Sequence, residues 1–538
     1  MLSKSNFYVI IGILCLLIFP YTVISYNNMG EDEFISFRYV HNFINGNGLV
    51  YNIGERVEGY SNFLWVMALS LPALFGGDLL FWSKLGGIIC IAGMMIISGR
   101  YFMDSTRRQI PPILLLAPIT LFFNPMLHYN AHRGLETCFY SFLLLAAVYT
   151  FSRGLLLRSS LLFGLVSLTR PEGIFHFGIF CTAMILFLLF GNKGNLLRFN
   201  PWLNNNKKNI IHFFIPCVVL FGLFIVWRLL YYGQIFPNTV YAKTSMTNFF
   251  YNSSLSDLLQ FVKSWSGVPL AALLIVLVIK VKGDIILPFY CSLIAVLSLF
   301  IFIIFVGRVQ ASPFQHFIPL IPFIVLIIQG GIYSLYQTHV RYKYIIIAGS
   351  FILIMINFYT ENNLDHPASR IHIRTGRFLK NLDWKACWEC FNYPPIHHFA
   401  ATGRWISENL PSKALLAADQ MGQLGYYAPQ SIIDLLGLMD RHISHYGLDW
   451  EYIKQRNPDY IIPFAVGNTP YIYPVKDLTE RSEFKDRYEL THILVTRYPE
   501  KINHQFLVYS RRQGLSDKSP QIIPIGATRE EWEKYWRF

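Results

Sequence analysis

Three consecutive acidic residues, Glu31-Asp32-Glu33, follow the first apolar stretch of the chain and are candidates for acid–base chemistry. A carboxylate can take a proton from an attacking hydroxyl group, and neighbouring acids raise one another's pKa, which suits a base near neutral pH. Asp32 also has a structural explanation, because it precedes the amphipathic stretch Phe34–Val40 and Asp is a good helix N-cap. The sequence therefore leaves both roles of Asp32 open, and also whether a divalent cation lies near it.

Further charged residues occur in short loops between apolar segments, where ionisable groups are costly and are candidates for function. Arg and Lys can hold a phosphate group, and carboxylates can bind or deprotonate hydroxyl groups. Arg170-Pro171-Glu172 interrupts an apolar run and is either a turn with a local ion pair or a fixed pair whose Arg faces a lipid phosphate. Lys243 either extends along apolar surface or reaches a phosphate. The candidate positions are Glu31, Asp32, Arg38, Arg56 and Glu58 in the first loop, His132, Arg133 and Glu136 in the second, Arg170 and Glu172 in the third, and Lys243 in the fourth.

The composition indicates that these loops belong to a membrane protein. The chain has 538 residues, of which 53% are hydrophobic and only 14% charged, and its mean hydropathy is +0.38. A soluble protein carries about 25% charged residues. Of the net charge of +13, residues 361–538 contribute +1 and the preceding part +12. A basic excess confined to the apolar part fits positively charged inner loops, and it argues against nucleic acid as a partner.

The apolar segments predict a polytopic α-helical membrane protein with about eleven transmembrane helices. The first segment has features of a signal peptide, but its apolar run is longer than a usual signal core, so we interpret it as an anchor. The basic loops all fall on the inner side only if Phe63–Phe81 is not a full crossing, and we expect this stretch to lie on or dip into the outer surface. The first outer loop then covers residues 27–84. The expected spans are Phe7–Tyr26, Leu85–Tyr101, Pro111–Leu127, Glu136–Phe151, Ser159–Leu168, Gly173–Phe190, Ile210–Leu230, Val268–Ile279, Ile285–Val306, Phe317–Tyr336 and Tyr344–Phe358.

After a transmembrane module of residues 1–359, residues 360–538 predict a soluble α/β domain on the outer side. The expected elements are strands at Ala414–Ala418, Ser431–Leu435, Tyr460–Pro463 and Phe506–Tyr509, with a helix at Ala400–Asn409. Cys387 and Cys390 form the only close cysteine pair. No second pair follows, so the spacing favours a local disulfide over a zinc site. We assign no metal ligands and no cofactor, and a divalent cation near Asp32 stays an open alternative.

The first outer loop is unusually informative. Gly30–Tyr39, Asn45–Asn52 and Gly54–Trp65 have the sequences GEDEFISFRY, NGNGLVYN and GERVEGYSNFLW. Together they closely resemble the first outer loop of the terminal β-arabinofuranosyltransferases of the mycobacterial cell wall and their bacterial relatives, which are C-type (GT-C) glycosyltransferases. Shorter matches continue at Gly134–Thr137, Leu168–Gly173, Trp227–Arg228, Tyr231–Gly233, Pro237–Thr239, Tyr241–Lys243 and Asp434–Asp440.

The resemblance implies a GT-C bundle with an outer soluble domain in the bacterial inner membrane, with the active site and this domain facing the periplasm. It implies transfer of a monosaccharide, which the resemblance suggests is a pentofuranose, from a polyprenyl-phosphate donor to a hydroxyl of a cell-envelope glycan or another acceptor. Asp32 would be the general base, with Glu31 as its partner, and the anomeric carbon would be inverted. The remaining expected roles are donor-phosphate binding by Arg38, Arg133, Arg170 and Lys243, and sugar or acceptor binding by Arg56, Glu58, His132, Glu136, Glu172 and Asn238.

The sequence departs from the family pattern at two places. Glu31 stands where relatives commonly have Asp, and the stretch around Gly307-Arg308 lacks the acidic residue that relatives often carry there. The second departure puts in doubt whether the donor or the acceptor is the same sugar as in those relatives. Two other functions remain open, namely a flippase for a lipid-linked sugar and a non-enzymatic outer binding protein. A flippase would need basic groups at membrane depth, but neither a carboxylate in the first loop nor a large outer domain.

Overall fold

The computed structural model describes residues 2–25, 30–103, 109–190, 207–245, 285–306, 315–342, 398–467, 469–497, 504–512 and 519–526, with isolated positions between and after them. The chain forms two compact units, each assembled from separate stretches of sequence. The first, here called the helical unit, comprises Met1–Asn28, Ser83–Val226 and Phe250–Leu382. The second, the mixed unit, comprises Met29–Trp82, Trp227–Phe249 and Asp383–Phe538.

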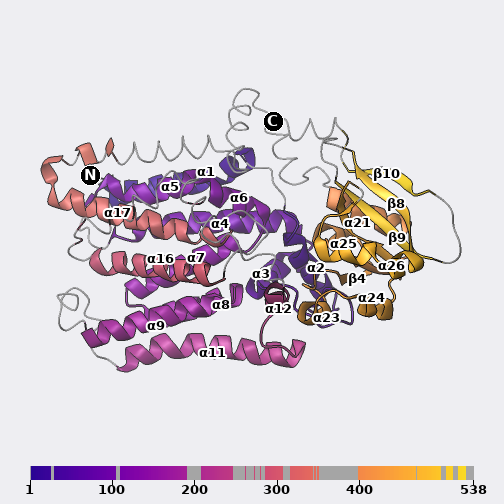
Figure 1. The fold of residues 1–538 in the computed structure, drawn as a ribbon. Helices are drawn as coiled ribbons and strands as arrows, with labels where there is room; N and C mark the ends of the chain where they lie inside the picture. The colour runs from indigo at the N-terminus through magenta and orange to yellow at the C-terminus, as the bar shows by residue number, and fades with distance from the viewer. Residues whose placement is uncertain are drawn as a thin grey trace. The chain divides into compact units, whose positions relative to one another are not determined.

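The helical unit is a set of apolar helices that run side by side (Figure 1). Five described helices are long and apolar enough to cross a membrane, or six if the pair Pro112–Phe123 and Pro125–Arg133, bent by 46°, forms one span. α17 is buried along most of its length, whereas α11 exposes Leu223 and Leu230. The helices are α1 (Lys4–Ser25), α4 (Leu79–Arg100), α5 (Leu116–Phe123), α6 (Pro125–Arg133), α7 (Thr137–Ser152), α8 (Leu156–Thr169), α9 (Gly173–Phe190), α11 (Lys207–Tyr232), α16 (Ile286–Val306) and α17 (Leu320–Thr338).

Most of the expected spans coincide with a described helix, but several of these helices are short. Thr137–Ser152, Leu156–Thr169 and Gly173–Phe187 are apolar helices of 10–17 residues. A helix of this length covers about 15–26 Å, less than the ~30 Å of a bilayer core. The count of eleven therefore stays a prediction. The expected spans at 268–279 and 344–358 lie almost wholly outside the described residues, as do Cys387 and Cys390.

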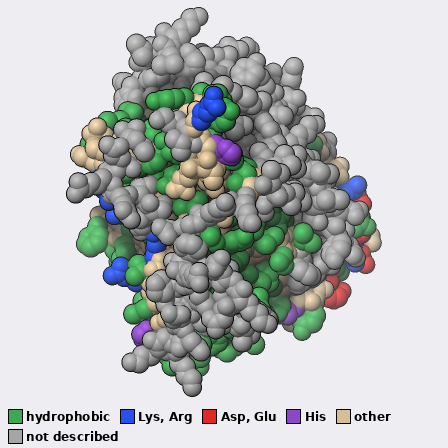
Figure 2. All heavy atoms as spheres, turned by 90° about the vertical axis from the view of Figure 1, so that its left-hand side faces the viewer, with side chains coloured by type: hydrophobic (Ala, Val, Ile, Leu, Met, Phe, Trp, Pro, Cys, Tyr) green, Lys and Arg blue, Asp and Glu red, His purple; other side chains and the backbone are tan. Residues whose placement is uncertain are grey.

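Figure 2 views the molecule from the left-hand side of Figure 1. Hydrophobic side chains appear over much of the described part of this face, and scattered Lys and Arg side chains lie among them. Apolar side chains that are exposed on membrane-crossing helices are expected to contact lipid. Leu16, Ile304 and Leu230 are examples, because each is more than three-fifths exposed on α1, α16 or α11.

The mixed unit contains a twisted sheet with the strand order β10-β8-β9-β5-β3-β4. β3 pairs in parallel with β4 and β5, whereas β9 pairs antiparallel with β5 and β8. A buried apolar cluster that includes Ala417, Ile433 and Ile461 packs on these strands. The strands are β3 (Leu415–Ala418), β4 (Ser431–Asp434), β5 (Tyr460–Ile462), β6 (Phe464–Val466), β7 (Thr469–Pro470), β8 (Tyr488–Thr496), β9 (His504–Arg511) and β10 (Gln521–Ile525).

The four expected strands are confirmed as β3, β4, β5 and β9, and the expected helix as α21 (His398–Asn409). The strands β6, β7, β8 and β10 were not predicted from the sequence. β8 has the sequence YELTHILVT, and most of its residues are only half-buried. Polar residues at these half-buried positions lower the apolar signal on which strand prediction depends.

The first outer loop belongs to the mixed unit. α2 (Glu33–Ile44) confirms the helix expected at Phe34–Val40, and it ends before Gly46, whose φ of +80° favours glycine. α3 (Phe63–Leu74) has 12 residues, or about 18 Å, which is shorter than a bilayer core, and residues 79–81 already belong to α4. The expectation that residues 63–81 do not cross a membrane stays a prediction. The expected domain boundary near residue 360 lies outside the described residues and stays a prediction.

Candidate functional site

The twelve residues predicted to take part in function divide between the two units. The mixed unit contains Glu31, Asp32, Arg38, Arg56, Glu58, Asn238 and Lys243, and the helical unit contains His132, Arg133, Glu136, Arg170 and Glu172.

The acidic turn before α2 packs against the start of α22 (Gln423–Tyr427). The backbone N–H of Gly422 donates to Oε1 of Glu31 at 2.5 Å, and Nε2 of Gln423 donates to the carbonyl oxygen of Gly30 at 2.7 Å. Burial raises the pKa of the Glu31 carboxyl well above its ordinary value, and the charge of Asp32 raises it further, while the Gly422 hydrogen bond partly opposes both effects. Glu31 is therefore a fixed carboxyl group that holds its proton more strongly than a solvent-exposed glutamate.

Asp32 stands at the first position before α2, where the sequence allowed either a helix cap or a catalytic base. Its side chain makes no capping hydrogen bond, and the backbone at Asp32 is already helical, with φ −66° and ψ −30°. An N-cap side chain normally accepts a hydrogen bond from the N–H two or three residues later. Capping therefore does not account for an aspartate at this position, and the role of Asp32 as a base stays a prediction.

Arg38, expected to bind the donor phosphate, directs its guanidinium group at protein carbonyl groups. Nε donates to Tyr51 O at 2.9 Å, Nη1 donates to Gly425 O and to Ala428 O, and Nη2 donates to Gln430 O at 2.8 Å. The guanidinium also lies 4.2 Å from the centre of the Tyr51 ring. With four of its five N–H donors used in this way, Arg38 is better explained as the group that ties residues 425–430 to α2 than as a phosphate ligand.

Glu58, expected to bind sugar or acceptor, forms a buried ion pair with Arg228. Arg228 Nε lies 2.7 Å from Oε2, and Nη2 donates to Oε1 at 3.2 Å. Burial raises the pKa of Glu58 to about 7, and the charge of Arg228 opposes that rise. The pair joins the first loop to the end of α11, so a structural role for Glu58 is favoured.

Asn238 is fully buried at the start of α12 (Asn238–Ser245). Its Nδ2 donates to Gly437 O at 2.8 Å and to Leu438 O at 3.0 Å, and its Oδ1 accepts from Ser444 Oγ at 2.8 Å. These bonds use most of the hydrogen-bonding capacity of the Asn238 side-chain amide. Asn238 is therefore better explained as a clamp, meaning a residue that holds residues 437–444 in place, than as a ligand for sugar.

Arg56 and Lys243 are the other two cations expected in this unit. Arg56 is exposed and lies 4.7 Å over the Tyr231 ring. This cation–π contact leaves its guanidinium at the surface, where it can meet an anion. The backbone of Lys243 belongs to α12, but its side chain lies outside the described part of the structure.

In the helical unit, Arg170 joins two predicted acids. Its Nε lies 2.5 Å from Glu172 Oε1, its Nη1 lies 3.4 Å from Glu136 Oε1, and its Nη2 is 3.3 Å from Nδ1 of His316. The local ion pair considered for Arg170-Pro171-Glu172 is therefore present. His316 was not identified from the sequence, because no local motif marks it and its partner is 146 residues away.

His132 and Arg133 lie at the buried C-terminal end of α6. The helix ends at Gly134, whose φ of +76° satisfies a left-handed cap, and the guanidinium of Arg133 is 6.0 Å from the Tyr129 ring. Basic residues in the last turn of a helix also interact favourably with its C-terminal partial charge. Among the described residues, no group of three His, Cys, Asp or Glu side chains could hold a metal ion.

The comparisons with known proteins identify the fold. A family described as a domain of unknown function (DUF8728) matches residues 392–514, and no curated protein matches the sequence. The structure of ArnT from Cupriavidus metallidurans bound to undecaprenyl phosphate is similar, with a TM-score of 0.55, 12% identity, and coverage of 96% of this chain and 100% of that one.

Two structures of the Archaeoglobus fulgidus oligosaccharyltransferase are also similar. The apo form has a TM-score of 0.53 at 11% identity. The form called AglB, in complex with an inhibitory peptide and a dolichol-phosphate, has a TM-score of 0.50 at 12% identity. In both comparisons 99% of this chain and 77% of the other are covered.

These similarities extend over nearly the whole chain at 11–12% identity. At such identities the shared property is the fold. The protein is therefore a multi-pass membrane protein with the GT-C fold and a C-terminal α/β region, which confirms the expected fold class. The particular resemblance to arabinofuranosyltransferases is not confirmed.

Proposed function

We propose that this protein is a membrane glycosyltransferase that transfers a monosaccharide from a polyprenyl-phosphate donor to an acceptor hydroxyl group. The observation that carries the proposal is the position of Asp32 on a GT-C fold, in the acidic turn at the start of the buried helix α2 and next to Glu31. A lipid-phosphate donor is supported by two neighbours, because ArnT was solved with undecaprenyl phosphate and AglB with a dolichol-phosphate.

In the proposed reaction Asp32 removes the proton from the acceptor hydroxyl group as its oxygen attacks the anomeric carbon. The bond from that carbon to the phosphate oxygen breaks, and the polyprenyl phosphate leaves with the electron pair. A single displacement inverts the configuration at the anomeric carbon. The transition state has oxocarbenium character, and cationic groups stabilise the charge that develops on the phosphate.

The candidates for this electrostatic role are Arg133, Arg170 and Lys243, with Arg56 as a further exposed cation. Arg170 already pairs with Glu136 and Glu172. We therefore propose that these three side chains form one polar group in the helical unit, and that the two carboxylates reduce the positive charge that Arg170 can offer to a phosphate. Glu31 is proposed to hold the acidic turn in place beside Asp32. A pentofuranose as the sugar, a cell-envelope glycan as acceptor and a periplasmic active site in a bacterial inner membrane are parts of this proposal.

The test is transfer by purified protein supplied with polyprenyl-phosphate-linked arabinofuranose or with polyprenyl-phosphate-linked hexoses. We expect labelled sugar to reach an acceptor extracted from the cell envelope. Asp32→Asn should lower the transfer rate about 10²–10⁴-fold, the range of general-base catalysis. The matched control is Glu55→Gln, which neutralises a carboxylate of the same loop that pairs with Arg456 at 2.8 Å.

Full transfer by Asp32→Asn would refute its role as the base. Movement of an intact lipid-linked sugar across vesicles, without transfer from any donor, would instead establish the flippase alternative. Product with retained configuration, measured by NMR of the anomeric proton, would contradict single displacement.

A further inference from the structure

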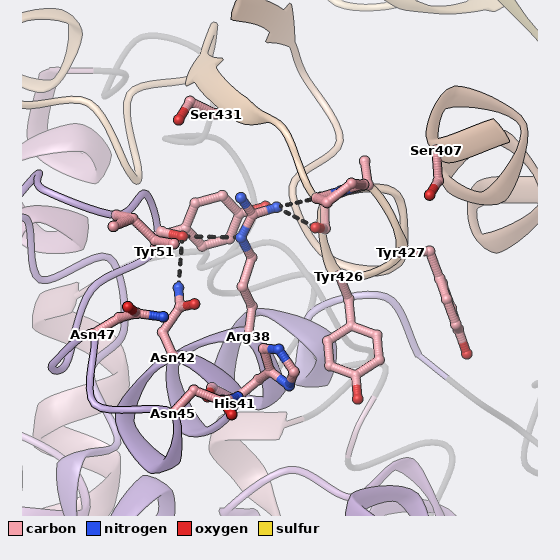
Figure 3. Close-up of a pocket in the computed structure, with 14 residues that line it drawn as sticks. Arg38, His41, Asn42, Asn45, Asn47, Tyr51, Ser407, Tyr426, Tyr427 and Ser431 are labelled. Carbon is pink, nitrogen blue, oxygen red and sulfur yellow. Dashed lines mark hydrogen bonds between the residues drawn. The ribbon is translucent and has the colours of Figure 1, made fainter. Parts of the chain in front are cut away.

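A cavity of about 590 Å³ lies within the mixed unit, between α2 and the segment 425–431. One wall is formed by α2 and the turn that follows it, including His41, Asn45 and Asn47. Tyr426 and Tyr427 at the end of α22 and Ser407 of α21 line the other side (Figure 3). This volume falls within the ~300–1,000 Å³ that is usual for small-molecule sites.

The walls of this cavity are tied together by the protein itself. Arg38, which lines the cavity, donates hydrogen bonds to the carbonyl groups of Gly425, Ala428 and Gln430. Nearby, the side chain of Asn52 donates to Ile432 O at 2.9 Å and accepts from Ile432 N at 3.0 Å. A site with fixed walls loses little conformational entropy when a ligand enters, so this cavity is preorganised for binding.

The side chains that line the cavity select a type of ligand. Asn45, Asn47, Ser407 and Ser431 are exposed at its edges and offer neutral amide and hydroxyl groups, which both donate and accept hydrogen bonds. Tyr426 and Tyr427 add half-buried aromatic rings against which the C–H face of a ligand can pack.

The charges of the residues that line the cavity also indicate an uncharged ligand. Among the described residues that line the cavity there is no carboxylate and no lysine, and its one permanent charge, Arg38, is directed at protein carbonyl groups. A phosphate or sulfate would favour an available cation, and a metal ion would favour carboxylates. A neutral ligand that carries many hydroxyl groups matches this lining best.

We propose that this cavity binds a neutral carbohydrate segment. If the proposed function holds, that segment is part of the acceptor glycan, and this assignment as acceptor rests on the proposed function. The binding itself needs no donor and no chemistry. A binding measurement without donor therefore separates a failure of this inference from a failure of the glycosyltransferase proposal.

The probe is the neutral oligosaccharide fraction released by mild acid hydrolysis from the envelope of cells that produce the protein. Saturation-transfer difference NMR with the full chain in detergent, without donor, should show transfer to the sugar ring protons. Ser407→Trp would place an indole at the cavity edge, and we expect it to weaken binding about tenfold or more. Asn47→Ala removes an amide from the opposite wall and should also weaken binding.

The matched control is Asn409→Trp, which introduces the same side chain on the same helix. Residues 407 and 409 are about 200° apart around α21, so this indole points away from the cavity. Asn409→Trp should bind as the wild type does. The proposal is overturned if no oligosaccharide binds the wild type, if Ser407→Trp and Asn47→Ala both bind unchanged, or if inorganic phosphate competes with the sugar for this site.

Discussion

The role of Asn238 can be decided by substitution. In Asn238→Ala the carbonyl groups of Gly437, Leu438 and Asp440 and the hydroxyl group of Ser444 each lose a hydrogen bond of 2.8–3.2 Å. Each such bond contributes about 0.5–1.5 kcal/mol net, and a buried group left without its partner adds to the loss. We therefore expect the mixed unit to lose about 2–4 kcal/mol of stability.

Ser444→Ala provides an internal scale, because it removes only one of the four hydrogen bonds of the Asn238 side chain. Its expected cost is about 1 kcal/mol, so the two variants should rank in this order. Ser482→Ala, at an exposed position in α26 (Ser482–Arg487), is the surface control and should leave stability unchanged. We would follow thermal unfolding in detergent at one fixed scan rate, since large membrane proteins often unfold irreversibly.

The sequence analysis assigned Asn238 to sugar or acceptor binding, and the same experiment separates that role from the structural one. A clamp lowers Tm and leaves the KM of the protein that remains folded unchanged. A ligand-binding amide raises the acceptor KM and leaves Tm unchanged. An Asn238→Ala protein with the wild-type Tm and a KM raised tenfold would refute the clamp.

Two more variants test the mixed unit. Arg38→Lys keeps the charge, but an ammonium group cannot donate to four carbonyl groups as the planar guanidinium does. We therefore expect a lower Tm and faster proteolysis at residues 425–430. Unchanged proteolysis would contradict this role of Arg38. The raised pKa of Glu31 means that the folded protein binds more protons than the unfolded chain between the ordinary value of 4.5 and the raised one. Its stabilising contribution is thus present below pH 4.5 and is lost as the pH rises through the raised pKa. Glu31→Gln should remove this part of the pH dependence of Tm, and an identical slope in the variant would show that Glu31 does not cause it.

The sequence alone determined the class of fold and several of its elements. A series of apolar segments predicts membrane spans, because a chain in lipid must satisfy its backbone hydrogen bonds within each helix. The strands β3, β4 and β5 are short buried runs bounded by polar residues, and α2 has an apolar face that ends at a glycine turn. These are local signals, and they are carried by neighbouring residues.

Only the tertiary structure decided which charged residues meet. Glu58 and Arg228 are 170 positions apart, and Arg38 and Gln430 are 392 apart, so no periodicity connects them. From the sequence, Arg38 and Glu58 were candidate ligands, because a single sequence does not distinguish an exposed charged residue from a buried, paired one. In the folded protein, the side chains of Arg38, Glu58 and Asn238 make internal contacts. Asp32 lies in the acidic turn at the start of α2 and stays the candidate base.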